Sequence, residues 1–419
     1  MRFLFLTQFY PPEVGATQNR VSDLAERLAR AGHKVTVLTA MPNYPQGKIF
    51  DAYRGKLWME EGSGSVRVLR VWSYATNSLG LIARLLSYLS YTIAAAIMAL
   101  ARGGDHDVLF VESPPLFLGL TGILVSRWRK SKLLFNVTDL WPASAVALGI
   151  LRNQTVIRMA TSLERFIYNR ADIITGQTEG IVEGVKARAP EIPVSLVMNG
   201  VSPEVFSSLS TARDEKRQEL GFANSFVVGY AGRHGIAQGL ATVLQAAETV
   251  SANHEIQFAF FGDGPEKDTL LKLSEQRGLK NVRFFSPRPA TEMPSILSCF
   301  DAAVVPLKKL DLFHGALPCK LFECMAAGIP VIVSIEGEAK RLVEKANGGI
   351  AIAPEDPAAM ADAILRLYRD SDLRVVMGQS GHSYTLSHCS RQNAADAIER
   401  LSAKSLIGNL EPQPVTQLP

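Results

Sequence analysis

Short apolar runs alternate with amphipathic segments along most of the chain. The first run, 2–7, precedes a segment at 15–31 in which Val21, Leu24 and Leu28 recur at the spacing of one helix face. Uninterrupted apolar runs of this length are typical of strands that are covered on both faces of a parallel sheet. The alternation therefore predicts an α/β protein built on parallel sheets.

The alternation of strands and helices occurs twice. In the first half the predicted strands are 2–7, 34–39, 66–71, 108–111, 133–137, 173–175 and 194–197. In the second half they are 226–232, 256–261, 282–285, 302–305, 330–333 and 349–352. Turn residues at 198–203 and a charged helical segment at 213–220 separate the two halves. We therefore expect two Rossmann-like domains, an N-terminal one at 1–203 and a C-terminal one at 204–385.

Three segments stand apart from this alternation. A helix at 386–405 is expected to pack back on the N-terminal domain, and the segment 406–419, with three prolines, is expected to be flexible. The segment 79–101, whose only charged residue is Arg84, is long and apolar enough to span a bilayer. Because strands of one predicted sheet precede and follow it, we expect a crossover helix that is half in the core and half facing a membrane.

Charge and cysteine content narrow the function classes. A net charge of +4 over 419 residues is too small for a nucleic-acid binder that relies on bulk charge. The four cysteines show no pairing pattern, and no histidine stands near them at zinc-ligand spacing. We therefore expect reduced thiols and no metal site.

The segment 315–333 contains the most informative motif. It predicts a loop, a short helix carrying Lys320 and Glu323, and a Gly-Pro break before a buried strand. A helix N-terminus binds anions, and Lys320 adds a full positive charge there. Glu323, one turn further, can accept hydrogen bonds from ribose hydroxyls. Together they indicate a nucleotide-sugar site, although an ordinary αβ unit with a solvated Lys and Glu remains open.

Two further loops of the second half follow predicted strands. The glycine-rich loop 229–240 carries Arg233, whose guanidinium can bind phosphate oxygens in a bidentate manner, while His234 is expected at the surface. The loop 262–266 leaves room for a flat base or a ribose, and Arg288 would close over that base. Ligands bind at the carboxyl ends of strands in such sheets, where both loops lie.

The first half offers a glycine and two carboxylates. Gly15 allows close approach of a ligand to a helix N-terminus, or only opens a tight turn. The absence of a full GxGxxG and of an acidic residue after 34–39 argues against a dinucleotide-dependent oxidoreductase. Asp139 and Glu112 each end a buried strand. Asp139 either caps the next helix or orients an acceptor hydroxyl.

These features together resemble the family-4 glycosyltransferases, which have the GT-B fold. The motifs that carry the resemblance are Tyr10-Pro11-Pro12-Glu13, Asp139-Leu140-Trp141-Pro142, Gly232-Arg233-His234-Gly235 and Phe322-Glu323-Cys324-Met325-Ala326. The most similar subgroup comes from bacterial O-antigen and capsule clusters and includes L-fucosamine transferases. The resemblance implies two Rossmann-like domains whose parallel sheets face each other across a cleft, and a retaining, metal-independent transferase.

The resemblance also implies substrates and a location. The donor would be a UDP-sugar, such as UDP-L-FucNAc or another N-acetylated 6-deoxyhexosamine, and no further cofactor is implied. The acceptor would be an undecaprenyl-diphosphate-linked saccharide of lipopolysaccharide or another surface polysaccharide. The protein would then be cytoplasmic and held at the inner-membrane leaflet. In the sequence itself, a second apolar run at 116–125 precedes Arg127, Arg129, Lys130 and Lys132, which we expect to face the lipid headgroups, unless both apolar helices are simply core.

Site roles follow residue by residue. Asp139, Arg233 and Lys320 would be catalytic, and Glu112 and Thr138 would lie on the acceptor side. The residues expected to contact the nucleotide sugar are Gly15, Gly232, Gly262, Asp263, Gly264, Arg288, Gly315, Ala316, Leu317 and Glu323.

Three positions depart from the family pattern. The first of two glutamates separated by seven residues is Gly315 here, so backbone N–H groups at 315–317 would contact the donor sugar instead. Gln238 replaces a lysine, which makes Lys320 the second cation, and Thr138 stands where a histidine is common. Two alternatives remain open: a GT-B sugar-nucleotide epimerase, which needs no acceptor, and a non-catalytic membrane scaffold.

Overall fold

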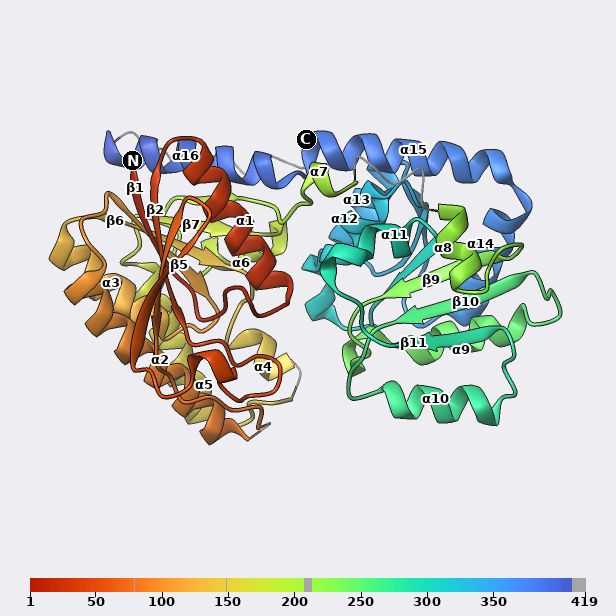
Figure 1. The fold of residues 1–419 in the computed structure, drawn as a ribbon, viewed down its shortest axis with the longest axis horizontal. Coiled ribbons are helices and arrows are strands. Elements are labelled where there is room, and N and C mark those ends of the chain that lie inside the picture. The colour runs from red at the N-terminus through yellow and green to blue at the C-terminus, as the bar shows by residue number, and fades with distance from the viewer. Residues whose placement is uncertain (79, 148, 207–212, 409–419) are drawn as a thin grey trace. The chain divides into compact units, whose positions relative to one another are not determined.

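The computed structural model describes residues 1–78, 80–147, 149–206 and 213–408. Its contacts divide the chain into two compact units (Figure 1). Unit 1 consists of Met1–Asn199 together with helix α16 (Arg391–Leu406). Unit 2 consists of Gly200–Ser390.

Unit 1 contains an eight-stranded sheet with the order β3-β4-β2-β1-β5-β6-β7-β8. Its strands are β1 (Arg2–Leu6), β2 (Lys34–Ala40), β3 (Trp58–Ser63), β4 (Val66–Val71), β5 (Val108–Ser113), β6 (Lys132–Val137), β7 (Ile173–Gly176) and β8 (Val194–Leu196). The predicted strands are confirmed and pair in parallel. The edge strand β3, antiparallel to β4, was not predicted, because its alternately exposed residues form no apolar run.

Two layers of helices cover this sheet. Phe3 and Phe5 of β1 pack on the side of α1 (Ala16–Arg30) and α16, and Leu4 and Leu6 pack on the opposite side, as strand alternation requires. The helices on that opposite side are α2 (Leu81–Arg102), α3 (Leu118–Arg129), α5 (Gln154–Tyr168) and α6 (Glu179–Lys186). In Figure 1, α16 runs along α1, and Arg27 donates to the Oε1 atom of Gln392 at 3.0 Å.

Helix α2 joins β4 to β5 of the same sheet. Among the described residues it is the one helix long and apolar enough to cross a membrane, judged by length and composition, and 33% of that apolar stretch is buried. Tyr91 and Ala95 belong to the core, and the Tyr91 hydroxyl donates to the carbonyl of Thr7 at 2.6 Å. Ile93 and Ile97 are exposed. One side of α2 is therefore core, and the other is not covered by unit 1.

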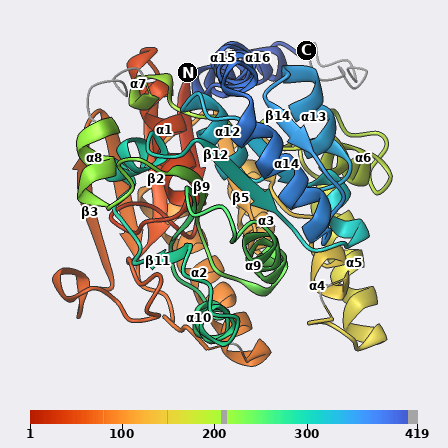
Figure 2. The ribbon, with the colours of Figure 1, turned by 90° about the vertical axis from the view of Figure 1, so that its right-hand side faces the viewer.

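Unit 2 contains a six-stranded parallel sheet with the order β11-β10-β9-β12-β13-β14. Its strands are β9 (Phe226–Ala231), β10 (Ile256–Phe261), β11 (Val282–Phe285), β12 (Ala302–Pro306), β13 (Val331–Ser334) and β14 (Gly349–Ala351), as predicted. Figure 2 shows α9 (Leu240–Thr249) beside α14 (Pro357–Arg369), with which it shares a core. The other helices that matter below are α8 (Arg213–Glu219), α10 (Lys267–Gln276), α12 (Cys319–Ala326), α13 (Glu338–Ala346) and α15 (Ser371–His388).

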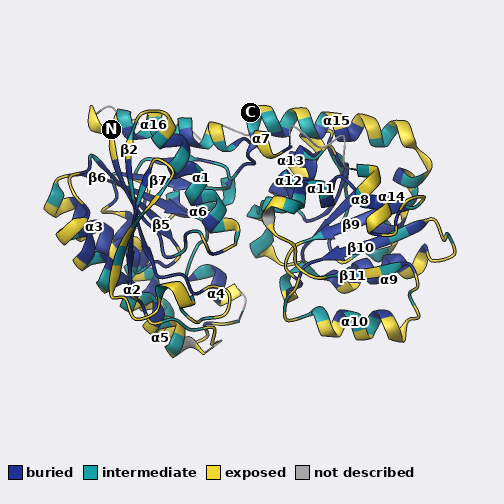
Figure 3. Cartoon of the chain, viewed as in Figure 1, coloured by how far each residue is buried: buried dark blue, intermediate teal, exposed yellow. Residues whose placement is uncertain are grey.

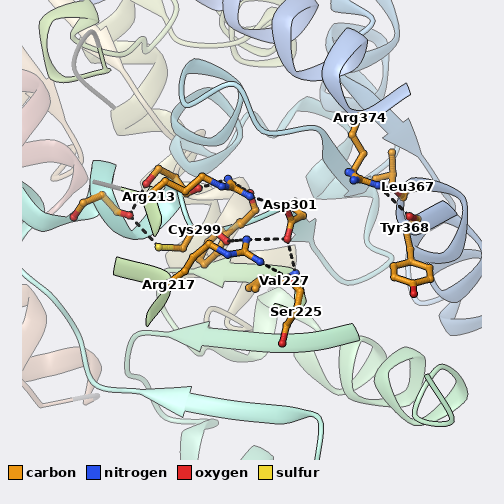
Figure 4. A network of polar contacts seen from close by, with 12 residues as sticks. Arg213, Arg217, Ser225, Val227, Cys299, Asp301, Leu367, Tyr368 and Arg374 are labelled. Atoms are coloured by element: carbon orange, nitrogen blue, oxygen red, sulfur yellow. Dashed lines mark hydrogen bonds and ion pairs between the residues drawn. The ribbon is translucent and has the colours of Figure 1, made fainter. Parts of the chain in front are cut away.

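Asp301, just before β12, anchors the charged helix α8 to the sheet (Figure 4). Its carboxylate accepts hydrogen bonds from Arg213 at 2.6 Å, from Arg217 at 3.0 Å and from the backbone N–H of Val227 at 2.8 Å. Arg217, which is buried, also donates to the carbonyl of Cys299 at 2.9 Å. The network satisfies a buried guanidinium and ties α8 to the starts of β9 and β12.

The boundaries between the two units lie at positions that differ from those expected. The N–H of Val201 donates to the carbonyl of Cys389 at 3.0 Å, and Val201 pairs with Ser390, so the chain enters unit 2 at Gly200 rather than after residue 203. The expected boundary at 385–386 lies inside α15, which runs to His388. Of the tail expected to be flexible, 409–419 lies outside the described residues.

Candidate functional site

The strand order of unit 2 changes direction between β9 and β12, which is the switch point where ligands bind in sheets of this type. The loop after β9 carries Gly232 and Arg233, and the chain after β12 leads to α12 with Lys320. These motifs are far apart in sequence but touch: the ammonium of Lys320 donates to the hydroxyl of Tyr230 at 2.6 Å. A Cβ atom at Gly232 would lie 2.8 Å from the Lys320 nitrogen.

The loops after β9 and β10 interlock. Gly262 has a φ of +141°, and a Cβ atom there would lie 1.9 Å from the carbonyl oxygen of Gly232. Gly264 has a φ of +156°, and its Cβ would lie 2.3 Å from the carbonyl oxygen of His234. The N–H of His234 donates to the carbonyl of Asp263 at 2.8 Å. These glycines therefore make room for the neighbouring loop, where the sequence suggested room for a base or ribose.

His234 is buried beneath these loops, so the expectation of a surface histidine was wrong. Its ring lies against the rings of Tyr230, Phe260 and Phe284. Burial, followed by the nearby positive charge of Lys267, lowers the pKa of His234 to about 4. The ring is thus neutral near pH 7 and supports the loops as an apolar core group does.

Lys320 and Arg233 provide the positive charge at this switch point. The Lys320 nitrogen lies 4.0 Å from the centre of the Tyr230 ring, and burial lowers the pKa of Lys320 to about 8, so most of it is charged at pH 7. Arg233 is exposed, and its backbone carbonyl accepts the Tyr230 hydroxyl at 2.7 Å. An exposed arginine and a partly buried lysine, joined through the Tyr230 hydroxyl, suit a diphosphate.

The other residues predicted for the nucleotide sugar lie near the same edge of the sheet. Glu323 is half-buried on α12, one turn after Lys320, and Arg288 is exposed in the loop after β11. Gly315 ends a short 3-10 helix, Asp311–Gly315. The N–H of Ala316 already donates to the carbonyl of Phe313 at 3.0 Å, so it cannot serve the donor sugar as expected. Gly315 and Leu317 remain candidates for that contact.

In unit 1 the strand order changes direction between β1 and β5. Gly15 precedes α1 with an extended φ of 175°, and a Cβ there would lie 2.4 Å from the Oε1 atom of Gln18. Glu112, at the end of β5, is buried and forms an ion pair with Arg20 of α1. Asn136 donates to the Glu112 carboxylate at 2.8 Å. Burial raises the pKa of Glu112, and the Arg20 charge opposes this rise. Glu112 therefore holds Arg20 and is not an exposed acceptor-side carboxylate.

Asp139 follows β6 and is half-buried. Its carboxylate accepts from the Ser144 hydroxyl at 2.7 Å, a bond into the short helix α4 (Ala143–Ala147). Burial raises the pKa of Asp139, and the bond from Ser144 opposes this rise. The neighbouring Thr138 donates to the carbonyl of Ser113 at 2.9 Å. Asp139 is thus fixed at the carboxyl edge of the sheet, consistent with either predicted role.

Within the part of the chain that the structure describes, no group of three or more His, Cys, Asp and Glu side chains could hold a metal ion. All four cysteines are free thiols.

Two family models together match most of the chain. Residues 15–200 match the glycosyl transferase 4-like domain, and residues 212–384 match the glycosyl transferases group 1. The chain therefore joins a glycosyl transferase 4-like domain to a glycosyl transferases group 1 domain, and it is a glycosyltransferase. The enzyme is 26% identical over 378 residues to a putative colanic acid biosynthesis glycosyl transferase, WcaI of Escherichia coli K12, with 87% of this chain and 91% of that protein covered.

Solved structures confirm the GT-B fold of the enzyme. Sucrose-phosphate synthase from Thermosynechococcus elongatus superposes with a TM-score of 0.77 at 18% identity, over 97% of this chain and 99% of that one. HepE of Anabaena, solved in complex with UDP-glucose, gives a TM-score of 0.70 at 18% identity, over 96% of this chain and 100% of that one. At such identities the likeness shows the fold alone.

The sequence analysis missed two residues that the glycosyltransferase places at its switch points. Tyr230 lies inside β9, where it was counted only as a strand residue, yet its hydroxyl contacts both cation-bearing segments. Arg20 lies one turn into α1 and pairs with Glu112. For Tyr230, the only signal in the sequence was a hydroxyl-bearing side chain near the end of a buried strand. For Arg20, no local feature distinguished it from other helical arginines.

Proposed function

We propose that the enzyme transfers a sugar from a UDP-sugar to a lipid-linked saccharide during the synthesis of a bacterial surface polysaccharide. The observation that carries the proposal is the pair of Arg233 and Lys320 at the switch point of unit 2, with Glu323 one turn further on α12. HepE, which shares the fold, was solved with UDP-glucose, and the name of WcaI refers to colanic acid biosynthesis.

The chemistry follows from the developing charge. As the bond between the anomeric carbon and the diphosphate breaks, negative charge accumulates on the leaving phosphate oxygens. Arg233 and Lys320 stabilise that charge from fixed positions, which is the largest expected catalytic effect. In unit 1, Asp139 would orient the acceptor hydroxyl, and burial, which raises its pKa, makes its carboxylate a better proton acceptor than a solvated aspartate. Family membership supports retention at the anomeric carbon.

For the donor sugar we propose an N-acetylated 6-deoxyhexosamine such as L-FucNAc. The supporting feature is Gly315, which stands where the family pattern has a carboxylate and is followed by the apolar residues Ala316 and Leu317. A methyl or acetyl group fits such a surface better than a hydroxyl group does. A screen of UDP-sugars against undecaprenyl-diphosphate-linked acceptors tests this choice.

Replacing Glu323 by Ala should raise the dissociation constant for UDP at least tenfold. A carboxylate that accepts hydrogen bonds from ribose hydroxyls contributes about 1.5–3 kcal/mol per bond. Calorimetric titration with UDP measures the effect, and Glu344→Ala, an exposed glutamate on α13, is the matched control. An unchanged affinity in a folded Glu323→Ala protein would remove this residue from the site.

Two alternatives make different predictions in the same assays. A sugar-nucleotide epimerase would convert UDP-sugar without any acceptor, so epimer formation in the absence of lipid would overturn the transferase proposal. A non-catalytic scaffold would not bind UDP at all. The positive charge at the switch point of unit 2 favours a protein that binds the nucleotide.

We further propose that the enzyme works in the cytoplasm, on the inner-membrane leaflet. The outer sides of α2 and α3 are apolar and exposed (Figure 3). The exposed apolar residues are Ile82, Leu86, Leu89, Ile93 and Ile97 on α2, and Leu120, Leu124 and Trp128 on α3. The exposed cations beside them are Arg84, Arg102, Arg127 and Lys130. An apolar face flanked by cations suits an anionic lipid surface.

The double change Arg127→Gln and Lys130→Gln should weaken binding to anionic liposomes by about 2 kcal/mol, or roughly thirtyfold, without changing UDP affinity. Sedimentation with liposomes at low and high salt measures this. The other two predicted cations are already engaged, since Arg129 donates to the Leu100 carbonyl at 2.6 Å and Lys132 pairs with Asp172 at 3.1 Å. The double change Arg129→Gln and Lys132→Gln is therefore the control. Equal losses in both proteins would contradict the assignment of Arg127 and Lys130.

A further inference from the structure

We propose that Tyr230 is a positioning residue that holds Lys320 and the Arg233 loop in one arrangement and keeps Lys320 protonated. The inference rests on the proposed function, because it concerns the diphosphate-binding cations of that site. Tyr230 is the last but one residue of β9, so the sheet fixes its position.

One hydroxyl joins the two cation-bearing segments. The ammonium of Lys320, on α12, donates to the Tyr230 oxygen at 2.6 Å. The same hydroxyl donates its proton to the backbone carbonyl of Arg233 at 2.7 Å. Gly232 lies between Tyr230 and Arg233 in sequence. It leaves space for the Lys320 side chain, since a Cβ atom at Gly232 would lie 2.8 Å from the Lys320 nitrogen. Both segments are thus tied to a single rigid strand residue.

The number of protons on each group sets the direction of these hydrogen bonds. A protonated lysine has donors only, so the Tyr230 oxygen must accept from it. The single Tyr230 proton is then free for the Arg233 carbonyl. Burial raises the pKa of the Tyr230 hydroxyl, so this proton stays in place through the working pH range. A neutral amine could still donate to the Tyr230 oxygen, but the bond from the charged ammonium is about twice as strong, so the contact favours the charged form of Lys320.

The charges around Lys320 show why this contact matters. Burial disfavours its charged form, and Cys324, Glu323 and Cys319 of its own helix oppose that effect. From the loop after β9, the buried His234 is neutral near pH 7. From α15, His382 bonds the carbonyl of Ala326 at the other end of α12, and the strands β12 and β13, against which α12 packs, are apolar except for Ser334. The Tyr230 hydroxyl thus gives the charged form of Lys320 a hydrogen-bond acceptor in these surroundings.

The variant Tyr230→Phe separates this role from packing. Phenylalanine keeps the ring under the Lys320 nitrogen and removes only the hydroxyl. Loss of an acceptor for the charged form should lower the pKa of Lys320 from about 8, by about one pH unit. UDP binds the charged form, so its affinity should fall with rising pH, by up to about tenfold per pH unit. In Tyr230→Phe that fall should begin at a pH about one unit lower.

The experiment is calorimetric titration with UDP at about seven pH values between pH 6.5 and 10. The four proteins are the wild type, Tyr230→Phe, Tyr91→Phe and Lys320→Arg. Tyr91→Phe removes a buried hydroxyl of unit 1 that lies within hydrogen-bond distance of two backbone carbonyls, and it is the control for lost stability. Lys320→Arg carries a charge that does not titrate in this range, and shows the contribution of the uracil's own ionisation. A lower onset in Tyr230→Phe alone supports the proposal.

Other outcomes have distinct meanings. A Tyr230→Phe protein that binds more weakly at every pH, with an unchanged onset, would reduce Tyr230 to a packing role and overturn the proposal. A Lys320→Arg protein whose affinity falls at the wild-type pH would also overturn it, because Lys320 would not be the titrating group. A wild-type protein that does not bind UDP would instead overturn the proposed function.

Discussion

Replacing Arg233 by Ala should lower kcat for sugar transfer by a factor of about 10²–10³, or about 2.7–4 kcal/mol of transition-state stabilisation. Arg233 is exposed on the loop after β9, and its carbonyl is held by Tyr230, so its guanidinium starts from a fixed backbone position. It would meet a diphosphate whose negative charge grows as the sugar leaves. Because the effect belongs mainly to the transition state, KM should change less than kcat.

Steady-state rates with UDP-sugar and acceptor, in the presence and absence of EDTA, test this prediction. Arg233→Lys should retain part of the activity, because a lysine keeps the charge but not the bidentate geometry. Arg277→Ala is the matched control, since Arg277 is paired with Glu248 beside α10, away from the switch point. Normal turnover by Arg233→Ala would exclude Arg233 from the reaction. Activity that disappears with EDTA would show that a metal carries the leaving-group charge.

Replacing Asp301 by Ala should lower the free energy of unfolding of unit 2 by about 3–5 kcal/mol. The change removes the carboxylate that pairs with Arg213 and Arg217 and that accepts the N–H of Val227. Arg217 has 8% of its side chain exposed, so its charge would stay buried with only backbone carbonyls as partners. Loss of a buried partner is more damaging than loss of a surface ion pair for this reason.

Denaturant unfolding followed by two probes makes this test specific to one unit. All four tryptophans, Trp58, Trp72, Trp128 and Trp141, lie in unit 1, so their fluorescence reports on that unit. Far-ultraviolet circular dichroism reports on both. Asp301→Ala should shift part of the dichroism transition to lower denaturant, and Glu275→Ala, an exposed residue of α10, should shift it by less than about 0.5 kcal/mol. An unshifted transition would show that the network adds no net stability.

Apart from the edge strand β3, the sequence alone determined the order of strands and of the main helices in both units, and it located the loops that carry the chemistry. Apart from Arg2 and Gln257, β1 and β10 are apolar, as a strand covered on both faces requires, so local pattern and final structure agree. The motifs around Arg233 and Lys320 stood out because glycines and isolated charges at strand ends have few other uses. The family itself was recognisable from these motifs.

Tertiary structure decided what each of these groups touches. Gly262 and Gly264 admit a neighbouring loop, His234 is buried under it, and Glu112 is taken up by Arg20, because residues distant in sequence occupy the space that each of them faces. The edge strand β3 exists only because β4 offers it hydrogen-bonding partners. Tyr230 acquires its role from two segments that meet only in the folded unit. Sequence patterns record the periodicity of burial, whereas the identity of a contact depends on which elements the sheet order brings together.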